Sequence, residues 1–286
     1  MKKYFILISS TLLCSLPSCI DDSAMVIPES SKSTENSIKS LSEVISTFDV
    51  IEDFASSSHL FMKRDESLMP ADAVVEVIDP TFDDGDGIEA LIDFGSLGLE
   101  PHGLLCKDNK YRAGIIRLQL DKPYSEVDAK LTLTFDEKSP FYSGDGSEMC
   151  EFKGSILISR VSEKELKLHC GELILTLEDE NPVTIIADLS ITCISDSGVG
   201  IVDDELDFDG KLEINTPDEK LTLSIIEPLQ KDYELSCAQY IKAGIIDVEL
   251  EKSISEIAID FDPDGDNTCD QTVGITVNGR AFRYSY

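Results

Sequence analysis

The strongest constraint on the fold is a period-two alternation of apolar and polar residues that begins near Ala73 and continues almost to the C-terminus. Clear examples lie at residues 131–135, 173–177 and 206–214. Successive side chains of a strand point to opposite faces, so this alternation is typical of antiparallel strands with one face on a core and one in water. Asp-Gly, Asn-Gly and Asn-Pro pairs between the runs indicate tight turns. We therefore predict a mainly β fold of roughly a dozen strands, arranged as a meander or a sandwich.

A different period precedes the strands. Apolar residues recur there at intervals of three and four: Ile38, Leu41, Val44, Ile45, Phe48, Ile51 and Phe54. This spacing is typical of an amphipathic helix, which we place within residues 36–60 and expect to end near residue 56. Acidic residues fall between the apolar positions and are expected on its solvent-exposed side: Glu43, Asp49, Glu52 and Asp53. The apolar side should pack on the β domain.

The first residues indicate export. Two lysines precede an apolar stretch over residues 4–13, which is too short for a mature membrane span of ~20 apolar residues. A positive start and a short apolar core are typical of a secretory signal, here residues 1–18. The sequence Leu16-Pro17-Ser18-Cys19 resembles the lipobox of bacterial lipoproteins. That resemblance implies cleavage before Cys19 and acylation of its thiol; an ordinary cleaved signal is the alternative.

Residues 19–35 comprise this cysteine and a polar, Ser-rich stretch that is typical of a flexible tether. Asp21 and Asp22 resemble the surface-export signal of Bacteroidetes lipoproteins. We therefore expect a palmitate-type anchor that holds the protein on the outer membrane, facing the cell surface, because acyl chains can replace a spanning helix. Residues 61–286 form the β-rich domain, either as one unit or as two related modules over about 73–200 and 201–286.

The charge of the chain excludes one class of partner. The formal net charge is −32, and it becomes −34 when Lys2 and Lys3 leave with the signal. Nucleic-acid binding needs a basic footprint, so nucleic acid is not an expected partner. The same charge disfavours direct adhesion to anionic headgroups, so membrane contact should run through the acyl chains on Cys19.

Six cysteines follow the anchor: Cys106, Cys150, Cys170, Cys193, Cys237 and Cys269. An even number in an exported chain predicts disulfides, although six cysteines allow 15 pairings and the sequence does not choose among them. Buried thiols are the alternative interpretation. No CxxC spacing occurs, which argues against a zinc site.

A short motif occurs twice. Ala-Gly-Ile-Ile stands at 113–116 and again at 243–246, each time after a cysteine, and Ile-Asp-Phe stands at 92–94 and 259–261. Duplicated β modules would produce this pattern, with chance similarity of β sequences as the alternative. The order of these features, together with the Asn-Gly-Arg turn at 278–280, resembles a group of uncharacterised Bacteroidetes surface lipoproteins. The resemblance implies a β-rich fold and a place on the envelope, and it implies no activity.

One loop near the C-terminus carries alternating carboxylates: Asp262, Asp264, Asp266 and Asp270. Calcium takes six to eight oxygen ligands, and a tight turn can bring several together. Asn267 stands where such loops usually have glycine, and Asn tolerates the left-handed conformation. A solvated hairpin turn is the favoured interpretation, and a calcium site is the alternative hypothesis. Asp83, Asp84, Asp86 and Glu89 form a second acidic turn.

No catalytic motif is found. None of the three histidines stands beside a nucleophile pattern, and neither GxSxG nor a phosphate-binding glycine loop occurs. We therefore predict a non-enzymatic, lipid-anchored envelope or surface protein with a binding, adhesion or structural role. Its expected partners are the membrane and a host or envelope protein or glycan. The alternative is a secreted glycan hydrolase whose carboxylates no motif distinguishes from surface charge.

Overall fold

The computed structural model describes residues 29–56, 67–177, 182–195, 201–217 and 219–285, with side chains from residue 33. It contains one helix, α1 (Glu29–Ala55), and sixteen strands. The strands are β1 (Val74–Asp79), β2 (Ile88–Asp93), β3 (Leu104–Leu105), β4 (Tyr111–Ala113), β5 (Ile115–Leu120), β6 (Lys130–Phe135), β7 (Phe141–Gly144), β8 (Met149–Arg160), β9 (Glu165–Thr176), β10 (Val183–Ser195), β11 (Glu205–Asn215), β12 (Lys220–Asp232), β13 (Ala243–Leu250), β14 (Ile257–Asp260), β15 (Thr272–Val277) and β16 (Arg280–Ser285).

All sixteen strands belong to one antiparallel sheet, so the predicted β meander is confirmed. Its order is β1-β2-β5-β6-β8-β9-β10-β11-β12-β13-β14-β15-β16, and the short strands β3, β4 and β7 branch beside β8. Strands β10 and β11 pair with each other across the boundary between the two predicted modules. One continuous sheet therefore contains both.

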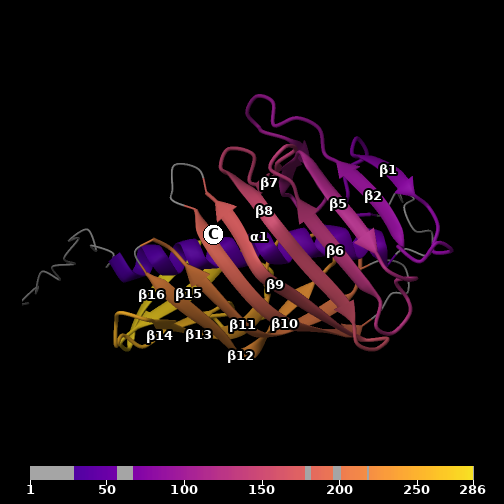
Figure 1. Ribbon diagram of the computed structural model, residues 1–286. Coiled ribbons are helices and arrows are strands. Elements are labelled where there is room, and N and C mark those ends of the chain that lie inside the picture. The colour runs from indigo at the N-terminus through magenta and orange to yellow at the C-terminus, as the bar shows by residue number, and fades with distance from the viewer. Residues whose placement is uncertain (1–28, 57–66, 178–181, 196–200, 218, 286) are drawn as a thin grey trace, which may run out of the picture.

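The sheet curves around α1, which runs along its concave side (Figure 1). Every residue from Ser40 to Ala55 is buried, including Glu43, Asp49, Glu52 and Asp53. The helix was predicted correctly, but its expected solvent-exposed side was wrong. Strands on opposite flanks of the sheet cover both sides of α1, and its carboxylates meet partners from those strands instead of water. The helix also begins at Glu29, so residues 29–35 of the predicted tether are helical.

A line of glycines allows the sheet to bend over the helix. Its members all have positive φ: Gly114 (82°), Gly154 (108°), Gly210 (125°) and Gly244 (121°). A Cβ at any of them would lie within 2.6 Å of a backbone carbonyl oxygen in a neighbouring segment of the chain. The pairing register also shifts beside this line, as in β8–β9 and β11–β12. Glycines and bulges are how sheets gain curvature, and we call this line the crease.

The crease explains the repeated motif. Gly114 and Gly244 lie at its two ends, and in each copy the glycine carbonyl accepts the N–H of a buried phenylalanine, Phe94 or Phe261. Ile92–Asp93 pairs with 115–116, and Ile259–Asp260 pairs with 245–246, in the same register. The two pairs follow opposite chain order, because the Ile-Asp-Phe strand precedes its partner in the first copy and follows it in the second. The likeness therefore corresponds to one local arrangement used at both ends of the crease.

Candidate functional site: a polar groove on the outer face

The candidate site is a groove of about 430 Å³ on the face of the sheet that points away from α1. It crosses β8, β9, β10 and β11. Its side chains alternate with Leu168 and Leu189, which are buried in the core on the opposite face. The groove is lined by Ser159, Lys167, Leu168, His169, Asp188, Leu189, Ser190, Asp209 and Gly210.

Strand register brings the polar residues of the groove into rows. Lys167 is paired with Ser159 of β8 on one side and with Ser190 of β10 on the other. Ser190 is paired in turn with Asp209 of β11. The four side chains therefore form a row across four strands, because paired residues of an antiparallel ladder point to the same face.

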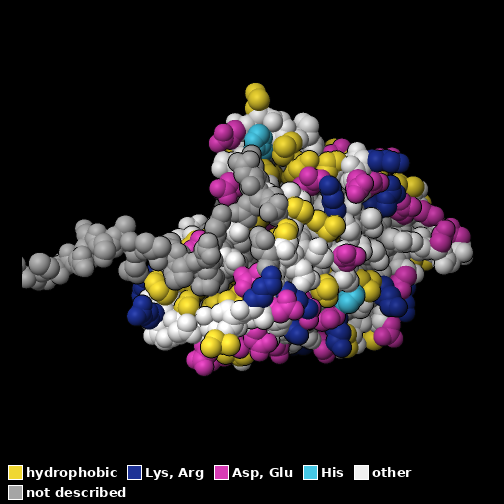
Figure 2. Space-filling model, turned by 60° about the vertical axis from the view of Figure 1, so that its left-hand side comes forward, with side chains coloured by type: hydrophobic (Ala, Val, Ile, Leu, Met, Phe, Trp, Pro, Cys, Tyr) yellow, Lys and Arg dark blue, Asp and Glu magenta, His cyan; other side chains and the backbone are white. Residues whose placement is uncertain are grey.

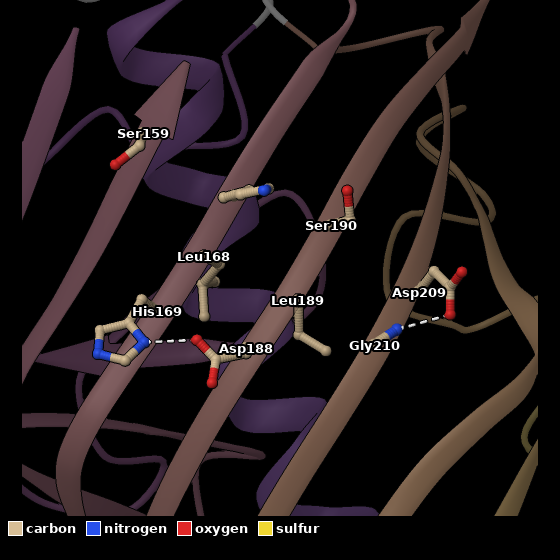
Figure 3. Close-up of a pocket in the computed structure, with 9 residues that line it drawn as sticks. Ser159, Leu168, His169, Asp188, Leu189, Ser190, Asp209 and Gly210 are labelled. Atoms are coloured by element: carbon tan, nitrogen blue, oxygen red, sulfur yellow. Dashed lines mark hydrogen bonds and ion pairs between the residues drawn. The ribbon is translucent and has the colours of Figure 1, made fainter. Parts of the chain in front are cut away.

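His169 and Asp188 form the next row and contact each other. Imidazole Nδ1 lies 2.6 Å from Asp188 Oδ1, and the two side chains are 51% and 76% exposed (Figure 3). Ser190 donates instead to Glu165 at 3.1 Å, and Asp209 accepts from the Gly210 N–H at 2.6 Å. Neither groove serine is hydrogen-bonded to the imidazole, so the geometry lacks the nucleophile–base contact of covalent catalysis.

The groove is suited to binding a polar ligand. Lys167 forms no ion pair within the described part of the chain, so its ammonium remains available as a donor. Hydroxyl and carboxylate oxygens beside it supply acceptors. On the molecular face in Figure 2, acidic and basic side chains are intermixed, with apolar groups between them. A mixed set of donors and acceptors above a shallow floor fits a sugar or an extended peptide better than a uniformly charged ligand.

The groove was not predicted, although Asp209 and Gly210 lie in a run that alternation predicts to be a strand. Alternation indicates that Lys167, His169 and Asp188 point outward, but it does not give the register that places them in adjacent rows. His169 is followed directly by Cys170 in β9, so the two side chains point to opposite faces of the sheet. The imidazole lies on the outer face and Cys170 is buried on the inner face.

A second group of polar residues lies inside the molecule, between α1 and the sheet. Glu43 pairs with Lys110 at 2.6 Å, and Asp49 pairs with Lys231 at 2.6 Å and accepts from the Tyr233 hydroxyl. Burial raises the pKa of Asp49, and the neighbouring Lys231 opposes this effect.

Glu52 lies farther along the same helix. It accepts from the Tyr124 hydroxyl and lies 3.5 Å from the Arg160 guanidinium. Burial raises the pKa of Glu52 to about 7, against the effects of Arg160 and Tyr124. Asp53 accepts from the Ser67 hydroxyl and from the N–H of Leu68.

The most deeply buried ion pair connects Arg112 of β4 with Asp108. The Arg112 guanidinium also donates to the Ser46 carbonyl of α1 at 2.8 Å. Burial opposes ionisation of Asp108, yet Arg112 holds the pKa of that carboxyl below its usual value. These interior charges connect the helix to the sheet.

The four carboxylates of the calcium hypothesis form hydrogen bonds and an ion pair in and around their own loop. Asp262 accepts from the N–H groups of residues 266 and 267, and Asp264 forms a two-fold ion pair with Arg283. Asp266 and Asp270 both accept from Thr268, and Asn267 has φ of 53°, the conformation expected for it. The structure thus describes a hydrogen-bonded hairpin loop, and calcium binding there stays a prediction.

In and beside the second acidic turn, three carboxylates lie close to one another. One oxygen each of Asp79, Asp84 and Asp86 lies within 4.8 Å of the others. A hydrogen bond between Asp84 and Asp86 lowers the pKa of Asp84 and raises that of Asp86. Acidic groups at a protein surface commonly lie this close together without an ion, so we propose no metal at this turn.

One predicted disulfide is present, between Cys237 and Cys269. Cys106, Cys150 and Cys170 are buried thiols, as in the alternative interpretation. Burial raises the pKa of Cys106 to about 11 and that of Cys170 to about 12, so neither is a reactive thiolate. Cys193 is partly exposed, and its thiol donates to the Ser195 carbonyl at 3.1 Å.

The predicted signal and the lipidation site at Cys19 lie outside the described residues. Within those residues, no helix is both long and apolar enough to cross a membrane. No family model, curated protein or solved structure matches this chain.

Proposed function

We propose that the chain is a lipid-anchored envelope protein, held on the outer membrane by acyl chains on Cys19 and facing the cell surface. Its role in this proposal is non-catalytic. The groove on the outer face binds a polar ligand, either a glycan or an extended segment of a host or envelope protein.

The observation that carries the proposal is the filled interior of the sheet. A wrapped sheet could enclose a substrate, but α1 occupies that space and is buried from Ser40 to Ala55. A glycoside hydrolase needs two carboxyl groups facing one bond, with the acid in an environment that keeps its proton. The interior carboxylates instead face cations and hydroxyls of the protein, while Asp188 in the groove is 76% exposed.

The position of α1 also suits an anchor. Nine residues lie between Cys19 and Glu29, the first residue of the helix. Fully extended, the ten Cα-to-Cα steps from Cys19 to Glu29 would reach about 35 Å. The helix begins at the end of the sheet that carries β15 and β16 (Figure 1), and Tyr284 of β16 lies within electrostatic range of Glu35 and Lys39. An acylated Cys19 would hold this end near the membrane and leave the outer face accessible.

The anchor is tested by metabolic labelling with a palmitate analogue in cells that express the chain. We expect label on the wild type and none on Cys19→Ser, with Cys14→Ser as the matched control that keeps its label. Protease treatment of intact cells should remove the wild-type protein. Label retained by Cys19→Ser, or full protection from protease, would contradict this part of the proposal.

The binding role is tested on glycan and peptide arrays with the purified chain. Lys167→Glu should abolish a wild-type signal, because it replaces the unpaired cation of the groove by a carboxylate. Lys138→Glu makes the same charge change in an exposed turn and should bind like the wild type. A signal unchanged by Lys167→Glu, or no wild-type signal on either array, would refute binding at the groove.

A further inference from the structure

The sheet is open at both ends. Its terminal strands are β1 and β16, and each is paired on one side only within the described residues. They lie at opposite ends of the molecule, so they do not close the sheet on itself (Figure 1). An open edge presents a row of backbone N–H and C=O groups that can pair with a strand of another molecule.

Edge strand β1 carries little of the usual protection against such pairing; its ladder with β2 shifts register between Val77 and Asp79, near the end of the strand. Val74, Val77 and Ile78 are 60%, 38% and 49% exposed. Natural edge strands are commonly blunted by lysine or proline. The sequence of β1, Val-Val-Glu-Val-Ile-Asp, contains neither. Its charges are both acidic.

Edge strand β16 has the opposite charge. Its sequence, Arg-Ala-Phe-Arg-Tyr-Ser, carries two arginines in a chain whose net charge is −32. Phe282 and Tyr284 pack against the core at this edge and remain partly accessible. Arg283 is 62% exposed while it pairs with Asp264, so the guanidinium still has donors for another partner.

Thirteen strands lie along the path from β1 to β16 and neighbours are antiparallel, so the two edge strands run in the same direction. A second copy that keeps its core face on the same side therefore adds its β1 beside β16 in a parallel register. When Glu76 is placed beside Arg283, Val75 lies beside Phe282 and Val77 beside Tyr284. These four residues also lie on the same face of the sheet, the one that covers the core. In β1, Val75 and Val77 are paired with buried Ile92 and Ala90. In β16, Phe282 and Tyr284 are paired with buried Ile275 and Val273. Apolar residues then meet on the core side, and opposite charges meet on the solvent side, which is a favourable cross-strand arrangement.

We propose that β1 of one molecule pairs with β16 of a second copy of this chain, so that the sheet continues from copy to copy. The occupant of each edge is the opposite edge of an identical molecule. Such a contact is heterologous, and it builds a linear array or a ring instead of a two-fold dimer. The backbone groups of both edges supply the affinity, and the Glu76–Arg283 pair fixes register and direction.

The test uses sedimentation velocity of the full chain in detergent over a hundred-fold range of concentration. The wild type should shift from monomer to larger species as concentration rises. Glu76→Arg places two arginines opposite each other, and Arg283→Glu places two glutamates opposite each other, so each variant should remain monomeric. Glu137→Arg, in an exposed turn away from both edges, should associate like the wild type.

The two charge-reversed variants also test each other. An equimolar mixture of Glu76→Arg and Arg283→Glu restores an opposite pair at every contact, so it should regain the large species, as should the double variant. This recovery excludes misfolding as the cause of the monomers. A wild type that stays monomeric throughout, or single variants that associate as it does, would overturn the proposal.

Discussion

The pH dependence of stability should depend strongly on Glu52. This carboxyl is buried between α1 and the sheet, and its pKa is raised from 4.5 to about 7. The folded protein therefore holds the proton more tightly than the unfolded chain. The stabilisation is complete below about pH 4.5 and is lost as pH rises through about 7. Glu52→Gln keeps the size and the acceptor for Tyr124 but removes the titration.

The magnitude follows from the two pKa values. Between pH 5 and pH 8, a group with a folded pKa of about 7 and an unfolded pKa near 4.5 loses about 2.5 kcal/mol of stabilisation. Burial also raises the pKa of Asp49, and Glu52→Gln leaves that group in place. The Gln variant removes only the part due to Glu52. The fall in unfolding free energy from pH 5 to pH 8 should therefore be about 2.5 kcal/mol smaller in Glu52→Gln than in the wild type.

Urea unfolding at the two pH values measures this difference. Far-UV circular dichroism is the suitable signal, because the chain contains no tryptophan. With an m-value of about 2.5 kcal/mol/M, the effect corresponds to about 1 M in the midpoint. Glu137→Gln, in an exposed turn, should retain the wild-type pH dependence. If Glu52→Gln loses as much stability as the wild type between pH 5 and 8, then Arg160 keeps Glu52 ionised and the reasoning is wrong.

Three further outcomes are expected. Replacing Cys237 and Cys269 by serine removes a disulfide that joins residues 32 positions apart. The free energy of unfolding should fall by about 3–4 kcal/mol, and a reductant should destabilise the wild type but not the variant. Gly210→Ala would place a Cβ 2.2 Å from a carbonyl oxygen and should cost roughly 3 kcal/mol in urea unfolding, whereas Gly265→Ala, with open space around it, should cost about 1 kcal/mol. If the C-terminal loop binds calcium, added calcium should raise the melting temperature of the wild type but not of Asp262→Asn; equal melting in calcium and EDTA would eliminate the hypothesis.

The strands could be predicted from the sequence because alternation reports directly on two faces of a sheet. Residues 131–135 and 206–214 lie in strands, and so does the run 173–177 except for its last residue. Curvature could not be predicted in the same way. Gly154 and Gly210 are ordinary strand interruptions in the sequence, and only the register shows that they stand beside carbonyls of neighbouring strands along one crease.

The side chains of α1 illustrate a different limit. A stripe of apolar residues predicts a helix, but it does not determine what lies opposite the stripe. The sequence pattern around a carboxylate such as Asp49 is the same whether its side chain faces water or a buried lysine. The partner Lys231 is 182 residues away, so no local pattern could identify it. The choice of Cys237 and Cys269 among 15 pairings likewise needed the packing of β13 to β15.

Buried polar contacts and sheet curvature depend on each other in this fold. Glu43, Asp49 and Glu52 lie at successive heights along α1 and meet Lys110, Lys231 and Arg160, which belong to distant parts of the sheet. These cations can converge on one helix only because the crease bends the strands around it. A rotation of α1, or a shift by one turn, would separate all three pairs at once. Leaving a buried polar group without its partner costs roughly 1–3 kcal/mol, and roughly 3–5 kcal/mol where the group is charged, so the three pairs together disfavour any other position of the helix.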